Sequence, residues 1–439
     1  MLRRKAYDAL LRWKNEPSRK CLMVKGARQV GKTYLVREFG KKEYESFVEI
    51  NFIKHRELKN IFSGDLSADE IYKRMTAQIR GLRLVPGKTL IFLDEIQNCG
   101  AARTAVKFLS EDGRFDVISS GSLLGLTYAE EGDTDVEEPE SVPTGYEDFL
   151  TLYSLDFEEF LWAEGYGVEA ISVLRRYYEA REPVPDGLNE QYENLFREYM
   201  VVGGMPEVVA EYTANHDFNA VARIQERILA NYRFDIAKHA KGAEKTKVRA
   251  CYDAVPKQLA RELKKFQYST VEKGKTAKKY GGSVRWLADS ALVHACYNVR
   301  EAYLPLNANA VDEQFKLYVN DTGLLCAMYG FETKKAVLMN TIQGNAKGGL
   351  YENIISESLI KNGYCLYYYK PDNTHELEFL LEKNGEVIPV EVKAGNNATV
   401  SLNAFIRKYT PHEAYKFVNG NIGVSDSKIT LPHYMVMFI

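Results

Sequence analysis

Short runs of hydrophobic residues recur through the first third of the chain, and segments with helical spacing of apolar positions separate them. The runs cover residues 21–24, 48–52, 90–93 and 116–120, and a helical pattern over residues 1–16 precedes the first. A short continuous apolar run bounded by turn residues is typical of a buried strand. Strands that alternate with helices in this way predict an α/β fold with a parallel sheet covered by helices.

The rest of the chain has two further patterns. Residues 147–235 have mostly helical spacing of apolar positions. Three strand-like runs follow at residues 366–369, 377–381 and 387–392, which predict a second sheet. With 439 residues, of which 45% are hydrophobic, the chain is long enough for two or three domains, each with its own core.

Cysteine usage and hydropathy bear on the compartment. The six cysteines form no C-x-x-C pair, so we expect neither a zinc site nor a disulfide framework, which fits a reducing cytoplasm. The N-terminus is charged and amphipathic, and no apolar run reaches the ~18 residues that a membrane span requires. We therefore expect a cytoplasmic protein without a membrane partner.

The first apolar run leads directly into a complete G-x-x-x-x-G-K-[ST] motif, the Walker A motif or P-loop. Backbone N–H groups of such a loop surround phosphate oxygens, and the following helix adds partial positive charge. We expect Lys32 to contact the β- and γ-phosphates of ATP and the hydroxyl of Thr33 to bind Mg²⁺. The predicted nucleotide-binding residues are Gly26, Ala27, Arg28, Gln29, Val30, Gly31, Lys32, Thr33 and Tyr34.

Two adjacent carboxylates end the third apolar run, as in a Walker B strand. Asp94 would hold Mg²⁺, and Glu95 would act as general base on the attacking water. The fourth run ends in Ser119-Ser120-Gly121-Ser122, and we favour Ser122 over Ser120 as a catalytic contact to the γ-phosphate or the water. The alternative is that these serines only form a turn.

On these motifs the chain resembles AAA-type ATPases. The resemblance is closest to a bacterial and archaeal group in which a winged helix and a nuclease-like domain of unassigned function follow the ATPase. It extends over nearly the whole chain, through the stretches GARQVGKT, LIFLDEIQ, SSGSLLG, SLDFEEFL, VVGGMPEVV, FKLYVNDTGLL and IPVEVKAG. The segment around Pro206 is similar to the lid of signal-transduction ATPases, where a proline packs near adenine. The alternative for Pro206 is a helix-breaking turn.

Charge is unevenly distributed, although the formal net charge is only -2. Residues 130–140 carry seven carboxylates and no basic residue, which indicates a solvated loop or, alternatively, a gate over a basic surface. Residues 238–285 have fourteen Lys or Arg against four Asp or Glu. We predict that residues 247–305 form a winged helix, with helices at 247–252, 256–265 and 275–290. Its DNA-binding residues would be Lys273, Lys275, Lys278, Lys279 and Arg285.

Two carboxylates and a lysine on the last predicted strands resemble the core of PD-(D/E)XK nucleases. Alternation along a strand places Glu391 and Lys393 on one face. The resemblance implies that Glu378, Glu391 and the helix acid Glu352 bind a metal, with Lys393 beside it. The family pattern usually has aspartate where this chain has Glu378, which puts retained cleavage in doubt.

Together these patterns predict four parts. They are an AAA-type P-loop core (1–145), a helical lid and connector (146–240), a winged helix (241–305) and a smaller restriction-endonuclease-like α/β domain (306–439). The expected function is Mg²⁺-dependent ATP hydrolysis that controls engagement of DNA. The alternative is an ATP-dependent switch whose inactive nuclease-like domain binds a protein partner. A homo-oligomer is left open, and Arg103, Arg114 and Arg197 are the candidates for a sensor arginine or an arginine finger.

Overall fold

The computed structural model describes residues 2–122, 143–240, 244–274, 276–372, 374–395 and 399–439. The chain folds into two compact units. The smaller unit consists mainly of Arg3–Tyr153, and the larger one mainly of Ser154–Ala288 and Leu292–Ile439. The acidic residues 130–140, Lys275 and the side chain of Ser122 lie outside the described residues.

The smaller unit is built on a five-stranded parallel sheet with the order β2-β3-β4-β1-β5. The strands are β1 (Cys21–Gly26), β2 (Ser46–Asn51), β3 (Thr89–Asp94), β4 (Asp116–Ser122) and β5 (Glu147–Thr151). All four predicted strands are therefore confirmed. The predicted core boundary at residue 145 is wrong, because β5 pairs with β1 beyond it. The hydrophobic pattern did not predict β5, because several of its residues are exposed and they do not form a continuous apolar run.

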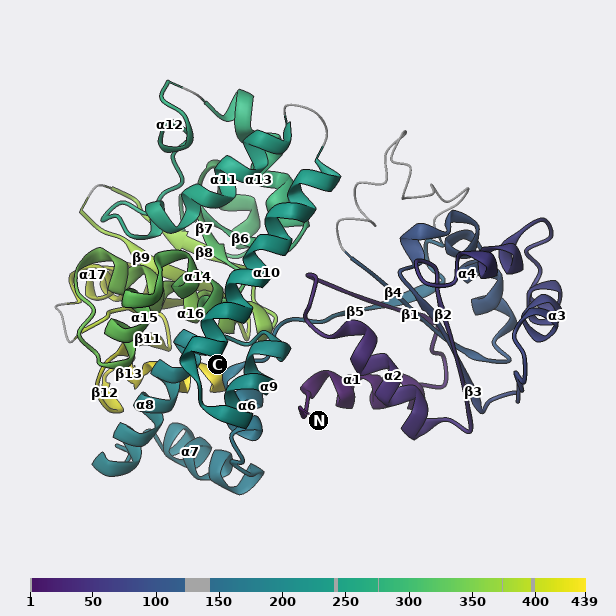
Figure 1. The fold of residues 1–439 in the computed structure, drawn as a ribbon. Helices are drawn as coiled ribbons and strands as arrows, with labels where there is room; N and C mark the ends of the chain where they lie inside the picture. Colours follow the sequence, from purple (N-terminus) through teal and green to yellow (C-terminus); the bar gives the residue numbers. More distant parts are fainter. Residues whose placement is uncertain (1, 123–142, 241–243, 275, 373, 396–398) are drawn as a thin grey trace. The chain divides into compact units, whose positions relative to one another are not determined.

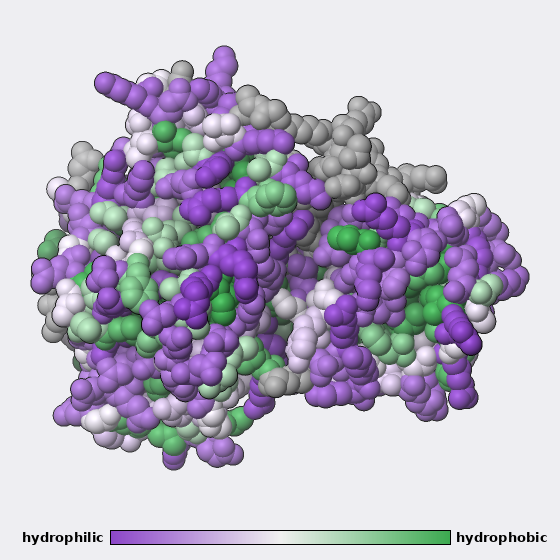
Figure 2. All heavy atoms as spheres, in the orientation of Figure 1, coloured by the Kyte–Doolittle hydropathy of each residue, from purple (hydrophilic) through white to green (hydrophobic). Residues whose placement is uncertain are grey.

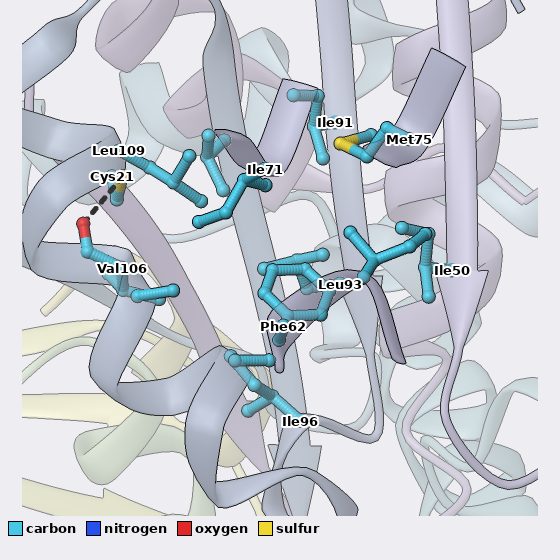
Figure 3. Close-up of a cluster of buried hydrophobic side chains, with 14 of the residues drawn as sticks. Cys21, Ile50, Phe62, Ile71, Met75, Ile91, Leu93, Ile96, Val106 and Leu109 are labelled. Atoms are coloured by element: carbon cyan, nitrogen blue, oxygen red, sulfur yellow. Dashed lines mark hydrogen bonds between the residues drawn. The ribbon is translucent and has the colours of Figure 1, made fainter. Parts of the chain in front are cut away.

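Helices cover this sheet (Figure 1). They are α1 (Lys5–Asn15), α2 (Lys32–Glu43), α3 (Ala68–Gln78) and α4 (Gly100–Asp112), with short 3-10 turns η1 (Arg56–Phe62) and η2 (Ile96–Asn98). One core cluster joins alternate strand residues such as Ile91 and Leu93 to Ile71 and Val106 of the helices (Figure 3). A second cluster forms around Val24, Phe39 and Phe92. The central strands β1 and β3 contribute to both clusters, which explains their continuous apolar runs.

The larger unit begins with a helical region that agrees with the helical spacing of residues 147–235. Its helices are α6 (Phe157–Ala163), α7 (Val168–Ala180), α8 (Asp186–Val202), α9 (Pro206–Asn215), α10 (Phe218–His239), α11 (Glu244–Leu259), α12 (Tyr268–Val271) and α13 (Ala277–Asp289). Two of the three predicted helices of the winged helix need correction. Helix α11 is continuous through Pro256, so the predicted separate helices at 247–252 and 256–265 are wrong. Only the predicted helix at 275–290 has a counterpart, α13.

The second sheet has eight strands in the order β12-β13-β11-β10-β9-β8-β6-β7. These are β6 (Val293–Val299), β7 (Ala310–Val319), β8 (Tyr367–Tyr369), β9 (Leu377–Lys383), β10 (Glu386–Val392), β11 (Ala414–Val418), β12 (Gly423–Ser425) and β13 (Lys428–Pro432). Its helices are α14 (Thr322–Tyr329), α15 (Phe331–Leu338), α16 (Gly344–Lys361) and α17 (Val400–Tyr409), with the turns η3 (Leu306–Asn309) and η4 (His433–Phe438).

This sheet is continuous across the predicted domain boundary between residues 305 and 306. Strand β6 lies within the range predicted for the winged helix, but it pairs with β7 on one side and with β8 on the other. The parallel pairing of β6 with β8 aligns residues such as Tyr297 and Tyr367, which are far apart in sequence. A local hydrophobic pattern contains no information about such a pairing. Within the described ranges, no helix is long and apolar enough to cross a membrane.

Candidate functional site

The P-loop connects β1, an interior strand of the sheet, to α2. Gly31 precedes α2 with φ 93°, a left-handed conformation that glycine adopts without strain. A Cβ atom on Gly26 would lie 2.2 Å from the carbonyl oxygen of Leu152 in the chain that continues β5. Glycine is therefore required at both ends of the loop, at Gly26 by close approach of a neighbouring strand and at Gly31 by backbone conformation.

Lys32 lies inside the loop and is 9% exposed. Its Nζ donates hydrogen bonds of 3.0 and 2.9 Å to the carbonyl oxygens of Gly26 and Ala27. Burial lowers the pKa of Lys32 to about 8, with opposing contributions from the charges of Glu95 and Asp94. A cation is thus held at the position where the motif predicts phosphate contacts.

Side chains from the ends of neighbouring strands and from the P-loop contact the carboxylate of Asp94. Thr33 Oγ1 donates to its two carboxylate oxygens at 3.1 and 3.2 Å, and Asn51 Nδ2 donates to Oδ2 at 2.7 Å. Ser120 Oγ of β4 donates to Oδ1. Asp94 is 1% exposed, so these donors stabilise a buried carboxylate. The structure brings the predicted site residues Thr33 and Asp94 together. Asn51, at the end of β2, was not predicted as a site residue.

Glu95 follows Asp94 with a left-handed backbone, φ 57°. Gln97 Nε2 donates to Glu95 Oε2 at 2.6 Å, and Asn98 Nδ2 donates to the Glu95 carbonyl at 3.1 Å. The amide oxygen of Gln97, Oε1, is buried and has no hydrogen-bond partner among the described residues. Gln97 therefore orients the proposed general base. Sequence reasoning did not single it out, although it lies only two residues further on.

The larger unit holds a second group of charged side chains where β9 and β10 pair antiparallel. Lys393 Nζ lies 3.3 Å from Glu378 Oε1 and 3.4 Å from Glu391 Oε1. The backbone N–H of Val392 donates to Glu378 at 3.0 Å. Glu391 is 1% exposed and its Oε2 has no hydrogen-bond partner among the described residues. Burial raises the pKa of Glu391 to about 7 and also raises that of Glu378.

Glu352 on α16 is engaged by other partners. Its Oε1 lies 2.9 Å from Lys264 Nζ, and its Oε2 accepts a hydrogen bond of 3.1 Å from Tyr318 and lies 3.5 Å from Lys316 Nζ. Burial would raise the pKa of Glu352, but the charges of Lys316 and Lys264 lower it overall. Lys316 also lies 2.7 Å from Glu376.

These contacts describe the residues of the predicted three-carboxylate metal site, which stays a prediction. Across the described ranges, no group of three or more His, Cys, Asp or Glu side chains could hold a metal ion. Glu378 and Glu391 share Lys393, whereas Glu352 faces two other lysines. Strand alternation predicts which side chains share a face, but it does not show which cations a helix acid meets.

Comparison with known families finds a match in the smaller unit. Residues 18–161 match the model of an AAA domain. The smaller unit is thus similar to AAA domains, and it is called the AAA domain below. Two further models match the larger unit: a domain of unknown function (DUF8612) over residues 193–335 and a domain of unknown function (DUF4143) over residues 347–434. The first of these extends across the predicted boundary at 305 and 306, in agreement with the continuous sheet.

Solved structures give only distant matches. The Walker-type ATPase paby2304 of Pyrococcus abyssi is 14% identical with a TM-score of 0.43, and the match covers 75% of this chain and 96% of that one. The Aeropyrum pernix Orc1 protein in complex with DNA is 12% identical with a TM-score of 0.26, over 77% and 94% of the two chains. No curated protein matches. The assignment of the AAA domain therefore rests on the family model and on the site geometry.

Of the candidate arginines, Arg103 and Arg114 lie in the smaller unit, away from its P-loop, and the role of all three stays a prediction. Arg103 Nη2 lies 2.5 Å from Glu147, which pairs with the first residue of β1, at the opposite end of the sheet. Arg114 binds Asp112 at 2.8 Å. Arg197 belongs to the larger unit.

The side chain of Ser122, the predicted catalytic serine, is not among the described residues. Ser120 is the serine that contacts Asp94.

Pro206 lies in the larger unit, at the first turn of α9. The preceding glycines form the turn between α8 and α9, which agrees with the alternative of a helix-breaking turn. A Cβ atom on Gly323 would lie 2.5 Å from the backbone nitrogen of Gly203. The motifs VVGGMPEVV and FKLYVNDTGLL therefore pack directly against each other. The contact of Pro206 with adenine stays a prediction.

The predicted DNA-binding residues lie on and before α13. Lys273, Lys278 and Arg285 are exposed, and Lys279 lies 2.8 Å from Glu272. The opposite face of α13 buries Tyr280, Val284, Trp286 and Leu287. Helix α13 is thus amphipathic, with a moderately basic outer face, and no contact within the described residues tests its binding to DNA.

Proposed function

We propose that this protein binds ATP with Mg²⁺ at the P-loop of its AAA domain and hydrolyses the γ-phosphate bond. The observation that carries the proposal is the contact of Thr33 with Asp94 beside the buried Lys32. A hydroxyl and a carboxylate are the hard oxygen donors that Mg²⁺ prefers, so the residues fit this ion. The ion would neutralise charge on the phosphate oxygens.

The remaining steps follow from the positions of the protein's own groups. The backbone N–H groups at the start of α2 and the Lys32 ammonium would bind the phosphates and stabilise the charge that develops in the transition state. Glu95 would accept a proton from the attacking water, held in orientation by the 2.6 Å hydrogen bond from Gln97. Buried donors around Asp94 keep that carboxylate in one position.

Two substitutions test this proposal. Lys32→Ala should abolish ATP turnover and weaken nucleotide binding, because it removes the ammonium that the motif places at the β- and γ-phosphates. Glu95→Gln should keep binding and lower the turnover rate by about 100-fold or more, since it removes the general base. Phosphate release and binding of a labelled ATP analogue would be measured side by side. Unchanged hydrolysis in Lys32→Ala would overturn the assigned site.

We further propose that nucleotide state controls the engagement of nucleic acid by the larger unit. The excess of Lys and Arg over residues 238–285 supports this function. The winged-helix and nuclease-like character of this unit belongs to the same proposal. DNA-stimulated ATP turnover is the expected result, and turnover that DNA leaves unchanged, with no DNA binding, would contradict it.

A second candidate is a switch whose C-terminal part binds a protein and does not cut nucleic acid. The ion pairs of Glu352 with Lys264 and Lys316 favour it, because two lysines then occupy a carboxylate that a nuclease would use to bind metal. Incubation of plasmid with the protein and Mg²⁺ or Mn²⁺ distinguishes the two. If the unmodified protein cleaves the plasmid and both Glu391→Ala and Lys393→Ala abolish cleavage, the second candidate is excluded.

A further inference from the structure

A groove of about 550 Å³ lies where α10, α11 and α14 meet in the larger unit. Its lining includes the cations Arg233, Arg249 and Lys257, the carboxylate of Asp253, and the side chains of Met328 and Tyr329. The groove is separate from the exposed face of α13, on which sequence reasoning placed the DNA contacts. Hydrophilic side chains predominate over α10 and α11 on the face that Figure 2 shows.

The cations are arranged by the helical repeat of α11. Val248, Cys251, Tyr252, Val255 and Leu259 are buried on one side of this helix. The outward positions 245, 249, 253 and 257 recur at intervals of four residues, which advances the chain by about 6 Å each time. Three of these positions are Lys245, Arg249 and Lys257. Arg249 and Lys257 line the groove, whereas Lys245 lies one turn before Arg249 on the same helix, outside the lining.

Asp253 orients the guanidinium groups and does not cancel their charge. Its Oδ1 accepts hydrogen bonds from Arg233 Nε at 3.1 Å and Nη2 at 3.0 Å, and its Oδ2 lies 3.6 Å from Arg249 Nε. One carboxylate thus serves two arginines. Throughout the described part of the chain, Lys257 has no carboxylate within ion-pair distance. Three cations against one anion leave the groove with a net charge of +2.

We infer that this groove binds the phosphate backbone of a nucleic acid. Guanidinium groups held by a carboxylate are pre-oriented for phosphate oxygens, and the side chain of Arg249 is 61% exposed and free to reach them. Arg249 and Lys257 lie about two turns apart on α11, which suits contacts with successive phosphates of one chain. The inference rests on the proposed engagement of nucleic acid and moves its principal contact from α13 to α10 and α11.

The test is binding of a fluorescein-labelled single strand and of the matching duplex to the full-length protein, followed by anisotropy over a salt series. Arg249→Gln combined with Lys257→Gln should weaken binding by about tenfold or more at low salt, and should lower the slope of log K against log salt by about 2. The matched control removes the same charge from α13 through Lys278→Gln combined with Arg285→Gln, and should change binding much less. Thermal melting shows whether each variant is folded.

The outcomes separate this inference from the proposed function. Loss of binding in the α13 pair with none in the α11 pair would overturn the groove and leave the proposed function intact. Absence of binding by the unmodified protein would contradict both. Equal binding of poly-glutamate, with the same dependence on Arg249 and Lys257, would assign the groove to an acidic protein segment and also overturn the inference.

Discussion

The backbone N–H of Gly204 donates a hydrogen bond of 2.7 Å to Oδ2 of Asp321, across 117 residues of sequence. The other carboxylate oxygen of Asp321 accepts from the N–H of Leu324 at 3.0 Å and so caps α14. The carbonyl of Gly204 accepts from the N–H of Leu155, at the start of the larger unit. A fully buried carboxylate thus joins the α8–α9 turn to α14 beside the chain that leaves the AAA domain.

Asp321→Asn should destabilise the larger unit. An amide can supply one acceptor for Leu324, but its NH₂ group would face the N–H of Gly204, and a buried donor would be left unpaired. The expected loss is about 1–3 kcal/mol in the free energy of unfolding. Urea denaturation of the full-length protein measures it, and Asp426→Asn on the exposed β12–β13 turn is the control. An unchanged midpoint would show that this bond contributes nothing to stability.

Asn51→Ala should raise the Mg²⁺ concentration that gives half-maximal ATP turnover by about 10- to 100-fold. The expected effect is indirect, because Asn51 positions the metal-binding carboxylate of Asp94 through the 2.7 Å hydrogen bond. The maximal rate at saturating Mg²⁺ should fall much less. Asn60→Ala, an exposed position of the same unit, is the control. A loss of maximal rate with an unchanged Mg²⁺ requirement would contradict the positioning role.

Nucleotide binding should weaken as the pH rises through 8. Burial lowers the pKa of Lys32 to about 8 in the nucleotide-free protein, so at higher pH the lysine must take up a proton before it can contact phosphate. The dissociation constant of an ATP analogue should therefore increase by about tenfold between pH 7 and pH 9. Calorimetry with the Glu95→Gln protein avoids hydrolysis. Affinity that stays constant over this range would mean that Lys32 keeps an ordinary pKa.

The stability of the larger unit should depend on the ionisation of Glu391. Burial raises the pKa of Glu391 from 4.5 to about 7, so the folded state holds a proton that the unfolded state releases between these values. The free energy of unfolding contributed by this group is therefore greatest at low pH and decreases as pH rises from about 4.5 to about 7.

Glu391→Gln should remove that part of the pH dependence. Urea midpoints of the two proteins, measured from pH 5 to pH 8, should differ in slope, with the variant relatively more stable at the alkaline end. Glu386→Gln, at the start of the same strand, is the control. Parallel curves for the unmodified protein and Glu391→Gln would show that Glu391 is ionised throughout this range.

Much of the AAA domain could be predicted because its determinants are local. The four apolar runs of the sheet, the loop from Gly26 to Thr33 and the two acids after β3 each occupy consecutive residues. Burial on both faces of a strand and the conformation of a tight phosphate-binding loop constrain neighbouring residues directly. The same locality led to two errors, since β5 has no apolar run and α11 continues through Pro256.

By itself, then, the sequence determined which residues form the nucleotide-binding loop and which strands support it. Only the tertiary structure decided that Asn51 and Ser120 hold Asp94, that β6 joins the C-terminal sheet, and that Glu352 faces Lys264 and Lys316. The physical reason is that hydrogen bonds and ion pairs between distant segments depend on which surfaces pack together. Hydrophobic spacing along a segment specifies that a face is buried, but not which polar groups it will meet there.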